Sequence, residues 1–146
     1  MTSSPEQRGE ADAKANERDE TRARAIIAGH AGFAEGLVSA VEQIAGTGSV
    51  FVPLSNSGLT SEDIEERFRA AALANDVRVF FTDLPAGSAT LAVRRLMRTD
   101  PTLILVTGAN LATLLEFVFH AEEDPVEAAR RAAEKGRASL VSHGGT

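Results

Sequence analysis

Short apolar runs alternate with longer amphipathic stretches through most of this chain, and this alternation constrains the fold more than any other feature. The longer stretches repeat apolar residues with the 3.6-residue period of a helix. Strands that alternate with helices are typical of an α/β protein. We therefore predict an open three-layer sandwich around a mostly parallel five-stranded sheet. The predicted strands are Arg24–Gly29, Ser49–Leu54, Val77–Thr82, Thr102–Thr107 and Arg137–Ser142.

Several single residues add detail to this prediction. Leu37, Val41 and Ile44 recur at helical spacing and are predicted to share one face of the first helix. Pro53 cannot donate to a strand ladder, so the second strand is predicted to lie at an edge of the sheet or to end there. Pro125 suits the first position of a helix and is predicted to open the fifth one. The third and fourth strands are continuously apolar, which is typical of strands covered on both faces.

Residues 1–22 contain no Val, Ile, Leu or Phe, so they cannot bury enough apolar surface to offset the entropy of ordering. We predict a disordered tail there, followed by one domain at residues 23–146. No run approaches 18 apolar residues, so no membrane insertion is expected. The first residues lack the basic-then-apolar layout of a signal peptide, which predicts the cytoplasm.

Composition excludes several classes of chemistry. The chain has no cysteine, which rules out a thiol nucleophile and Cys-ligated metal centres. Its formal net charge is −6 and only 5% of its residues are aromatic, which argues against nucleic-acid binding. His120 and His143 have no ligand partner at useful spacing, so no metal site is expected. A covalent intermediate would therefore form on a histidine, a hydroxyl or a carboxylate.

Reactions in open α/β sheets gather outside the carboxyl ends of the parallel strands, where the strand order reverses. The first predicted strand runs into His30 and the third into Asp83. In a flavodoxin-like order 2-1-3-4-5 these strands are neighbours, so the two side chains would face each other. A carboxylate that accepts from one ring nitrogen leaves the other as a nucleophile. Gly87 and Ser88 then begin a helix whose free N–H groups suit an anion such as a phosphoryl group.

Other interpretations remain open at this point. A histidine at a strand end is often a packing residue, and an aspartate there often caps the next helix. Thr82-Asp83 is also compatible with the phospho-acceptor aspartate of a receiver domain. That family, however, needs an acidic pair after the first strand and a lysine after the fifth. The only lysines here, Lys14 and Lys135, are badly placed for that role.

Three segments carry a family resemblance: Ala25–Leu37 (AIIAGHAGFAEGL), Phe81–Ser88 (FTDLPAGS) and Val106–Leu115 (VTGANLATLL). In order and spacing they resemble the IIA component of the mannose/fructose family of the bacterial phosphoenolpyruvate:sugar phosphotransferase system. The resemblance implies a five-stranded sheet with four strands parallel. The family is commonly a dimer in which the last strand is exchanged, and Arg137–Ser142 would be that strand.

The resemblance also implies roles for individual residues. His30 would be the phosphorylated histidine, which takes a phosphoryl group from phospho-HPr and passes it to a histidine of IIB for sugar uptake. Asp83 would orient the ring through Nδ1 and leave Nε2 to be phosphorylated. Ser88, together with Ala86 and Gly87, would hold the phosphoryl oxygens. No metal or cofactor is implied.

The chain departs from the family pattern at two places. Gly29-His30-Ala31 stands where the family usually has Thr-His-Gly, so a hydroxyl donor before the histidine is missing. The loop from Asp83 to Ser88 lacks an aromatic residue and contains Pro85. Two alternatives therefore stay open: a regulatory phosphohistidine domain without sugar transport, and the related phosphotransfer subunit of dihydroxyacetone kinase.

Overall fold

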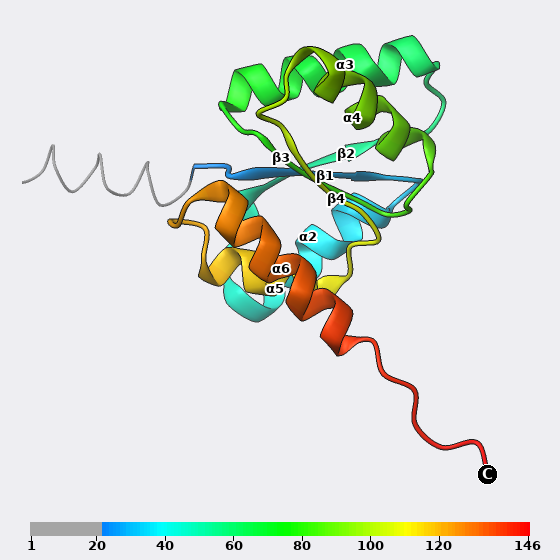
Figure 1. Ribbon diagram of the computed structural model, residues 1–146, viewed down its shortest axis with the longest axis vertical. Helices are drawn as coiled ribbons and strands as arrows, with labels where there is room; N and C mark the ends of the chain where they lie inside the picture. Colours follow the sequence, from blue (N-terminus) through cyan, green and yellow to red (C-terminus); the bar gives the residue numbers. More distant parts are fainter. Residues whose placement is uncertain (1–21) are drawn as a thin grey trace, which may run out of the picture.

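The structure, a computed structural model, describes residues 22–146 (Figure 1). The predicted disordered tail therefore lies outside the described residues, except for Arg22. The described chain forms one sheet with helices packed on both faces, which confirms the predicted three-layer α/β class.

The sheet has four parallel strands among the described residues, in the order β2-β1-β3-β4. This order agrees with the first four positions of the predicted one. Pro53 lies in β2 opposite Ile27, and β2 is an edge strand, as predicted. The strands are β1 (Ala25–Gly29), β2 (Phe51–Ser55), β3 (Val79–Thr82) and β4 (Ile104–Val106).

Alternate residues of each strand face opposite layers of helices. In β1, Ile26 and Ala28 pack toward α3 and α4, whereas Ala25 and Ile27 pack toward α2, α5 and α6, and all four are fully buried. Figure 1 shows these two groups of helices on opposite faces of the sheet. The helices are α2 (Phe33–Ala45), α3 (Ser61–Asn75), α4 (Ser88–Thr99), α5 (Leu111–Phe119) and α6 (Pro125–Ser139), and a 3-10 turn, η1, spans Gly48–Val50.

Two expectations about burial and strand count are wrong. The predicted fifth strand, Arg137–Ser142, is instead the last turn of α6 followed by residues without regular structure. Ala128, Ala132 and Gly136 are buried at four-residue intervals, which is the spacing of one face of a helix. This helical pattern continues into the last turn of α6, so Arg137 is part of the helix. As a consequence β4 is an edge strand, and its residues are half-buried rather than covered on both faces.

The first helix also differs from the prediction at one residue. Val41 is buried and Leu37 is partly buried, but Ile44 is 60% exposed. Ile44 lies in the last turn of α2, just before Gly46 ends the helix in the left-handed conformation, and the buried residues of α2 are Ala34 and Val41.

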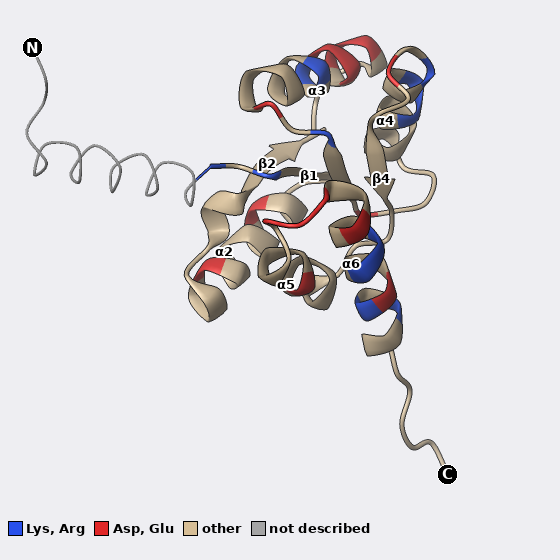
Figure 2. Cartoon of the chain, turned by 60° about the vertical axis from the view of Figure 1, so that its left-hand side comes forward, with Lys and Arg blue, Asp and Glu red and all other residues tan. Residues whose placement is uncertain are grey.

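The parallel strands place their carboxyl ends at one edge of the sheet, where α2, α3, α4 and α5 begin. Two of these helix starts are capped by side chains: Thr60 accepts a hydrogen bond from the Asp63 N–H, and Asn110 accepts one from the Thr113 N–H. The strands themselves carry no charged residue, and Figure 2 shows the charges on the surrounding helices and loops. No helix within residues 22–146 has the length and apolar character needed to cross a membrane.

Candidate active site

His30 and Asp83 meet at the carboxyl edge of the sheet, where they follow the neighbouring strands β1 and β3. The ring Nδ1 of His30 lies 2.7 Å from Asp83 Oδ2, and the backbone N–H of His30 donates to the same oxygen at 2.9 Å. The His30 side chain is 55% exposed, whereas that of Asp83 is 10% exposed. A largely enclosed carboxylate therefore holds a ring that another protein can reach.

The ionisation of Asp83 fixes which ring nitrogen carries the proton. Burial by itself raises the pKa of Asp83. The hydrogen bonds from the His30 backbone and ring, together with the positive charge that the ring can carry, lower this pKa by more than burial raises it. The net pKa lies below the usual 3.8, so Asp83 is a carboxylate at neutral pH. A carboxylate can only accept, so Nδ1 must donate and Nε2 of the neutral ring keeps its lone pair.

Two positions beside His30 are sterically or conformationally restricted. A Cβ on Gly29 would lie 2.7 Å from Phe33 Cδ1 and 2.8 Å from Asp83 Cγ, so a larger residue here would require these side chains to shift. Asp83 Oδ1 is buried without a hydrogen-bond partner among the described residues. Ala31 has a φ of 46°, a left-handed conformation that strains an L-residue by about 1–2 kcal/mol.

The loop after β3 lies against the ring of His30. A Cβ on Gly87 would be 3.2 Å from His30 Cε1, the ring carbon between the two nitrogens. Gly87 is the N-cap of α4 and Ser88 is its first residue, so the unpaired N–H groups of this helix start beside the ring. Ala86 is exposed in the same loop. The sequence-predicted site residues are thus brought together at one edge of the sheet.

Residues at the end of β2 also reach the site, and the sequence reasoning missed them. Asn56 is 6% exposed; its backbone N–H donates to Gly29 O, and its Nδ2 donates to Ser88 Oγ. Ser57 Oγ accepts a hydrogen bond from the Ala31 N–H at 3.1 Å. The available signal was a run of small polar residues directly after a strand that neighbours β1.

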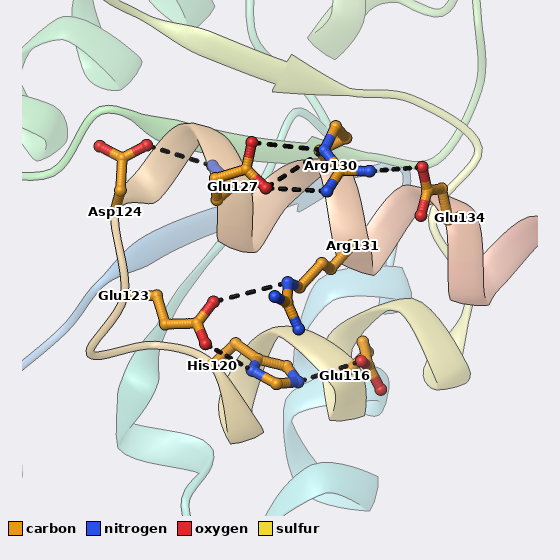
Figure 3. Close-up of polar contacts among 8 residues, drawn as sticks. All are labelled: Glu116, His120, Glu123, Asp124, Glu127, Arg130, Arg131 and Glu134. Carbon is orange, nitrogen blue, oxygen red and sulfur yellow. Dashed lines mark hydrogen bonds and ion pairs between the residues drawn. The ribbon is translucent and has the colours of Figure 1, made fainter.

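The other two histidines take no part in this arrangement. His120 caps the end of α5 and lies between two carboxylates, with Nε2 3.1 Å from Glu116 and Nδ1 3.1 Å from Glu123 (Figure 3). Glu123 also faces Arg131 of α6 at 3.6 Å, so these contacts join α5 to α6. His143 follows α6 and is exposed. Within residues 22–146, no group of three or more His, Asp or Glu side chains is placed to hold a metal.

Comparison with known families decides what kind of protein carries this site. A family model described as "PTS system fructose IIA component" matches residues 24–134, which include all four strands and both His30 and Asp83. The chain belongs to this IIA family. Membership confirms the resemblance of the three sequence motifs and places the chain among the phosphotransfer proteins of the phosphoenolpyruvate:sugar phosphotransferase system.

Solved structures share the IIA fold over most of their length. A phosphotransferase system component EIIA from Streptococcus agalactiae is 22% identical and superposes with a TM-score of 0.74, covering 82% of this chain and 95% of its own. A mannose/sorbose specific IIA subunit from Enterococcus faecalis is 21% identical, with a TM-score of 0.72 and coverages of 86% and 97%.

A third structure is described as a putative phosphoenolpyruvate-dependent sugar phosphotransferase system permease from Klebsiella pneumoniae. It is 26% identical, with a TM-score of 0.68 and coverages of 84% of this chain and 92% of its own. A comparison with curated proteins gave no significant match. Together with the family match, these structures place the described chain in the IIA fold.

Proposed function

We propose that this chain is a cytoplasmic histidine phosphocarrier, which accepts a phosphoryl group from phospho-HPr on His30 and passes it to a histidine of IIB for sugar uptake. The observation that carries the proposal is the half-exposed His30 ring, whose Nδ1 is held 2.7 Å from the Asp83 carboxylate, which is 10% exposed. Family membership supports the same role.

The transfer is an in-line displacement at phosphorus, which depends mainly on positioning. The Nε2 lone pair of His30 attacks the phosphorus. The P–N bond to the HPr histidine breaks, and its electron pair returns to that ring as it leaves. Because Nδ1 of His30 keeps its proton, the phosphorylated ring becomes a cation, and the Asp83 carboxylate stabilises it. The same step, with His30 as the leaving ring, delivers the group to IIB.

The incoming group brings up to two negative charges and three acceptor oxygens. Helix α4 begins at Ser88, next to Gly87, which lies against the ring of His30, and a helix N-terminus favours an anion. We assign the phosphoryl oxygens to the Ser88 hydroxyl and to the backbone of Ala86 and Gly87. Asp83 faces Nδ1, so its negative charge lies on the opposite side of the ring from Nε2.

Phosphorylation by the general components of the system tests the proposal. The full chain, incubated with enzyme I, HPr and radiolabelled phosphoenolpyruvate, is expected to acquire label that is stable in base and labile in acid. His30→Ala is expected to abolish the label, because no other described histidine has this environment. His120→Ala and His143→Ala are the matched controls and should label like the wild type. Labelling that survives His30→Ala would overturn the proposal.

Delivery to IIB separates sugar transport from regulation. Labelled protein mixed with the IIB domain of the same system is expected to lose its label to that domain. Label that forms from phospho-HPr but is never transferred to IIB would remove sugar uptake from the proposal and leave a regulatory phosphohistidine domain.

We also propose a homodimer held by the C-terminal segment. Leu140 is 85% exposed and Val141 is 60% exposed, although both are apolar. In the described chain β4 is an apolar edge strand, paired only with β3 and half-buried. Exposed apolar edges are sites of pairing with another chain. We therefore propose that the segment after Ser139 of one copy covers the β4 edge of the other copy.

A further inference from the structure

The residue after β2 is hydrogen-bonded both to β1 and to the start of α4, the two elements on either side of the site. Asn56 follows β2 directly, and its backbone N–H donates to Gly29 O at 3.1 Å, one residue before His30. Its side chain turns toward α4, where Nδ2 donates to Ser88 Oγ. Asn56 is buried, Ser88 is exposed, and the contact between them is partly buried.

The direction of this hydrogen bond determines what the Ser88 hydroxyl can do. An asparagine NH2 group has two donors and no acceptor, so Ser88 Oγ must accept from it. The Ser88 proton therefore cannot be donated back to Nδ2. Within residues 22–146 that proton is donated to no other group, which leaves it available to a ligand.

We propose that Asn56 is a positioning residue for phosphoryl transfer: it holds the Ser88 hydroxyl as a hydrogen-bond donor aimed at the phosphoryl group on His30. This inference rests on the proposed function and extends it to a residue that directly follows a third strand. A phosphoryl group has only acceptors, so a hydroxyl locked as a donor is already in the state the group requires. Asn56 thereby supports a hydroxyl donor in a chain where Gly29 offers none.

A purely structural role would give a different pattern of mutant effects. The link from Asn56 to Gly29 uses backbone atoms that alanine also has, so Asn56→Ala is expected to remove the contact with Ser88 and keep the bridge to β1. If Asn56 acts through Ser88, replacing it matters only while the Ser88 hydroxyl is present. Asn56→Ala, Ser88→Ala and the double variant therefore form a closed cycle.

The rate of His30 phosphorylation by phosphoramidate tests the inference without a protein partner. In this reaction Nε2 attacks phosphorus, the P–N bond of phosphoramidate breaks, and the leaving nitrogen takes up a proton to depart as ammonia. We expect N56A and S88A each to slow phosphorylation about tenfold, and the double variant to be no slower than S88A. Asn75→Ala removes a comparable asparagine, which bonds Ala71 O in α3, and should leave the rate unchanged.

A second variant guards against loss of folding. Asn56→Asp keeps the size of the side chain but turns the donor into an acceptor, so it would draw the Ser88 proton away from the phosphoryl group. We expect N56D to be at least as slow as N56A, with thermal unfolding measured on every variant. Wild-type rates in folded N56A or N56D would overturn the inference, as would a further slowing by N56A in the S88A background.

The same variants distinguish failure of the inference from failure of the proposed function. If wild type is labelled through HPr and folded N56A is labelled equally fast by both donors, the function stands and the role of Asn56 falls. If phosphoramidate gives the expected pattern but phospho-HPr never labels wild type, the role of Asn56 stands and the proposed donor falls.

Discussion

Asp83 couples the chemistry of the site to the stability of the fold. One of its oxygens accepts both the backbone N–H and the ring Nδ1–H of His30, so the same carboxylate joins β1 to β3 and selects the ring tautomer. Gly29 allows this approach because a larger residue would collide with Asp83 and Phe33. The stability of the folded chain should therefore report the ionisation of this one residue.

Acid unfolding of Asp83→Asn measures that coupling. The folded-state pKa of Asp83 is below 3.8, so the stabilisation from its carboxylate is complete above the unfolded-state pKa and is lost as the pH falls through the folded-state pKa. We expect wild type to exceed D83N in free energy of unfolding at about pH 5, with a margin that shrinks below about pH 4. Urea unfolding across this range gives the margin directly.

Asp100→Asn is the matched control, because Asp100 also has a lowered pKa through its hydrogen bonds with Thr102 but is exposed at the other end of the sheet. The difference in free energy of unfolding between wild type and D100N should be smaller, because solvent screens an exposed carboxylate. A margin for D83N that stays constant down to about pH 2 would contradict this account of Asp83.

At the residue scale, the sequence predicted the residues that follow apolar strands, His30 and Asp83. It did not predict Asn56, whose proposed role depends on a contact with another side chain. His30 and Asp83 could be paired because each follows an apolar strand and strand order makes those strands neighbours. Asn56 follows an edge strand in a run of small polar residues, which is an ordinary loop pattern. Its importance comes from a side-chain contact across 32 positions of sequence, and no local pattern encodes such a contact.

At the scale of elements, the sequence pattern predicted five strands and five helices; four strands and the five helices are present, and the fifth predicted strand overlaps the end of the last helix. Arg137–Ser142 contains the short apolar run Leu140-Val141, yet its first three residues complete α6. Tertiary packing decided this, because Gly136 lies against α5: Asn110 Nδ2 donates to Gly136 O at 3.0 Å. A local strand pattern cannot override a helix whose last turn is anchored in this way.

Two helical glycines test that packing. A Cβ on Gly136 would lie 2.0 Å from Thr113 Oγ1, and Thr113 is buried and bonded to Asn110, so it has little room to move. We expect Gly136→Ala to destabilise the fold by about 1–3 kcal/mol. A Cβ on Gly36 in α2 meets nothing within 4 Å, so Gly36→Ala should stabilise it by up to about 1 kcal/mol.

Chemical denaturation of both variants measures the two changes. If Gly136→Ala increased the free energy of unfolding as much as Gly36→Ala does, α5 and α6 would not pack as closely as described.

At the scale of the whole molecule, the proposed dimer depends on residues beyond α6. Removing residues 140–146 leaves every described helix and strand intact, so the truncated chain should fold. We expect the full chain to sediment as a dimer and the truncated chain as a monomer, at concentrations spanning the micromolar range. Leu140→Ser combined with Val141→Ser should have the same effect.

Leu73→Ser is the control for this experiment, because Leu73 is 77% exposed on α3, in the other helical layer. It should leave the association state unchanged. A truncated chain that sediments like the full one would show that the C-terminal segment does not hold the copies together.

The parallel arrangement of the strands also gives the domain two functionally different poles. The chain enters β1 at Ala25 and reaches His30 directly after Gly29, so the five-residue strand separates them by roughly 15 Å. A tether, fluorophore or fusion attached before Arg22 would thus join the pole opposite the reactive nitrogen. An N-terminally immobilised chain should present His30 outward to any protein flowed over it, whereas a C-terminal anchor would hold the domain by the segment proposed to pair two copies.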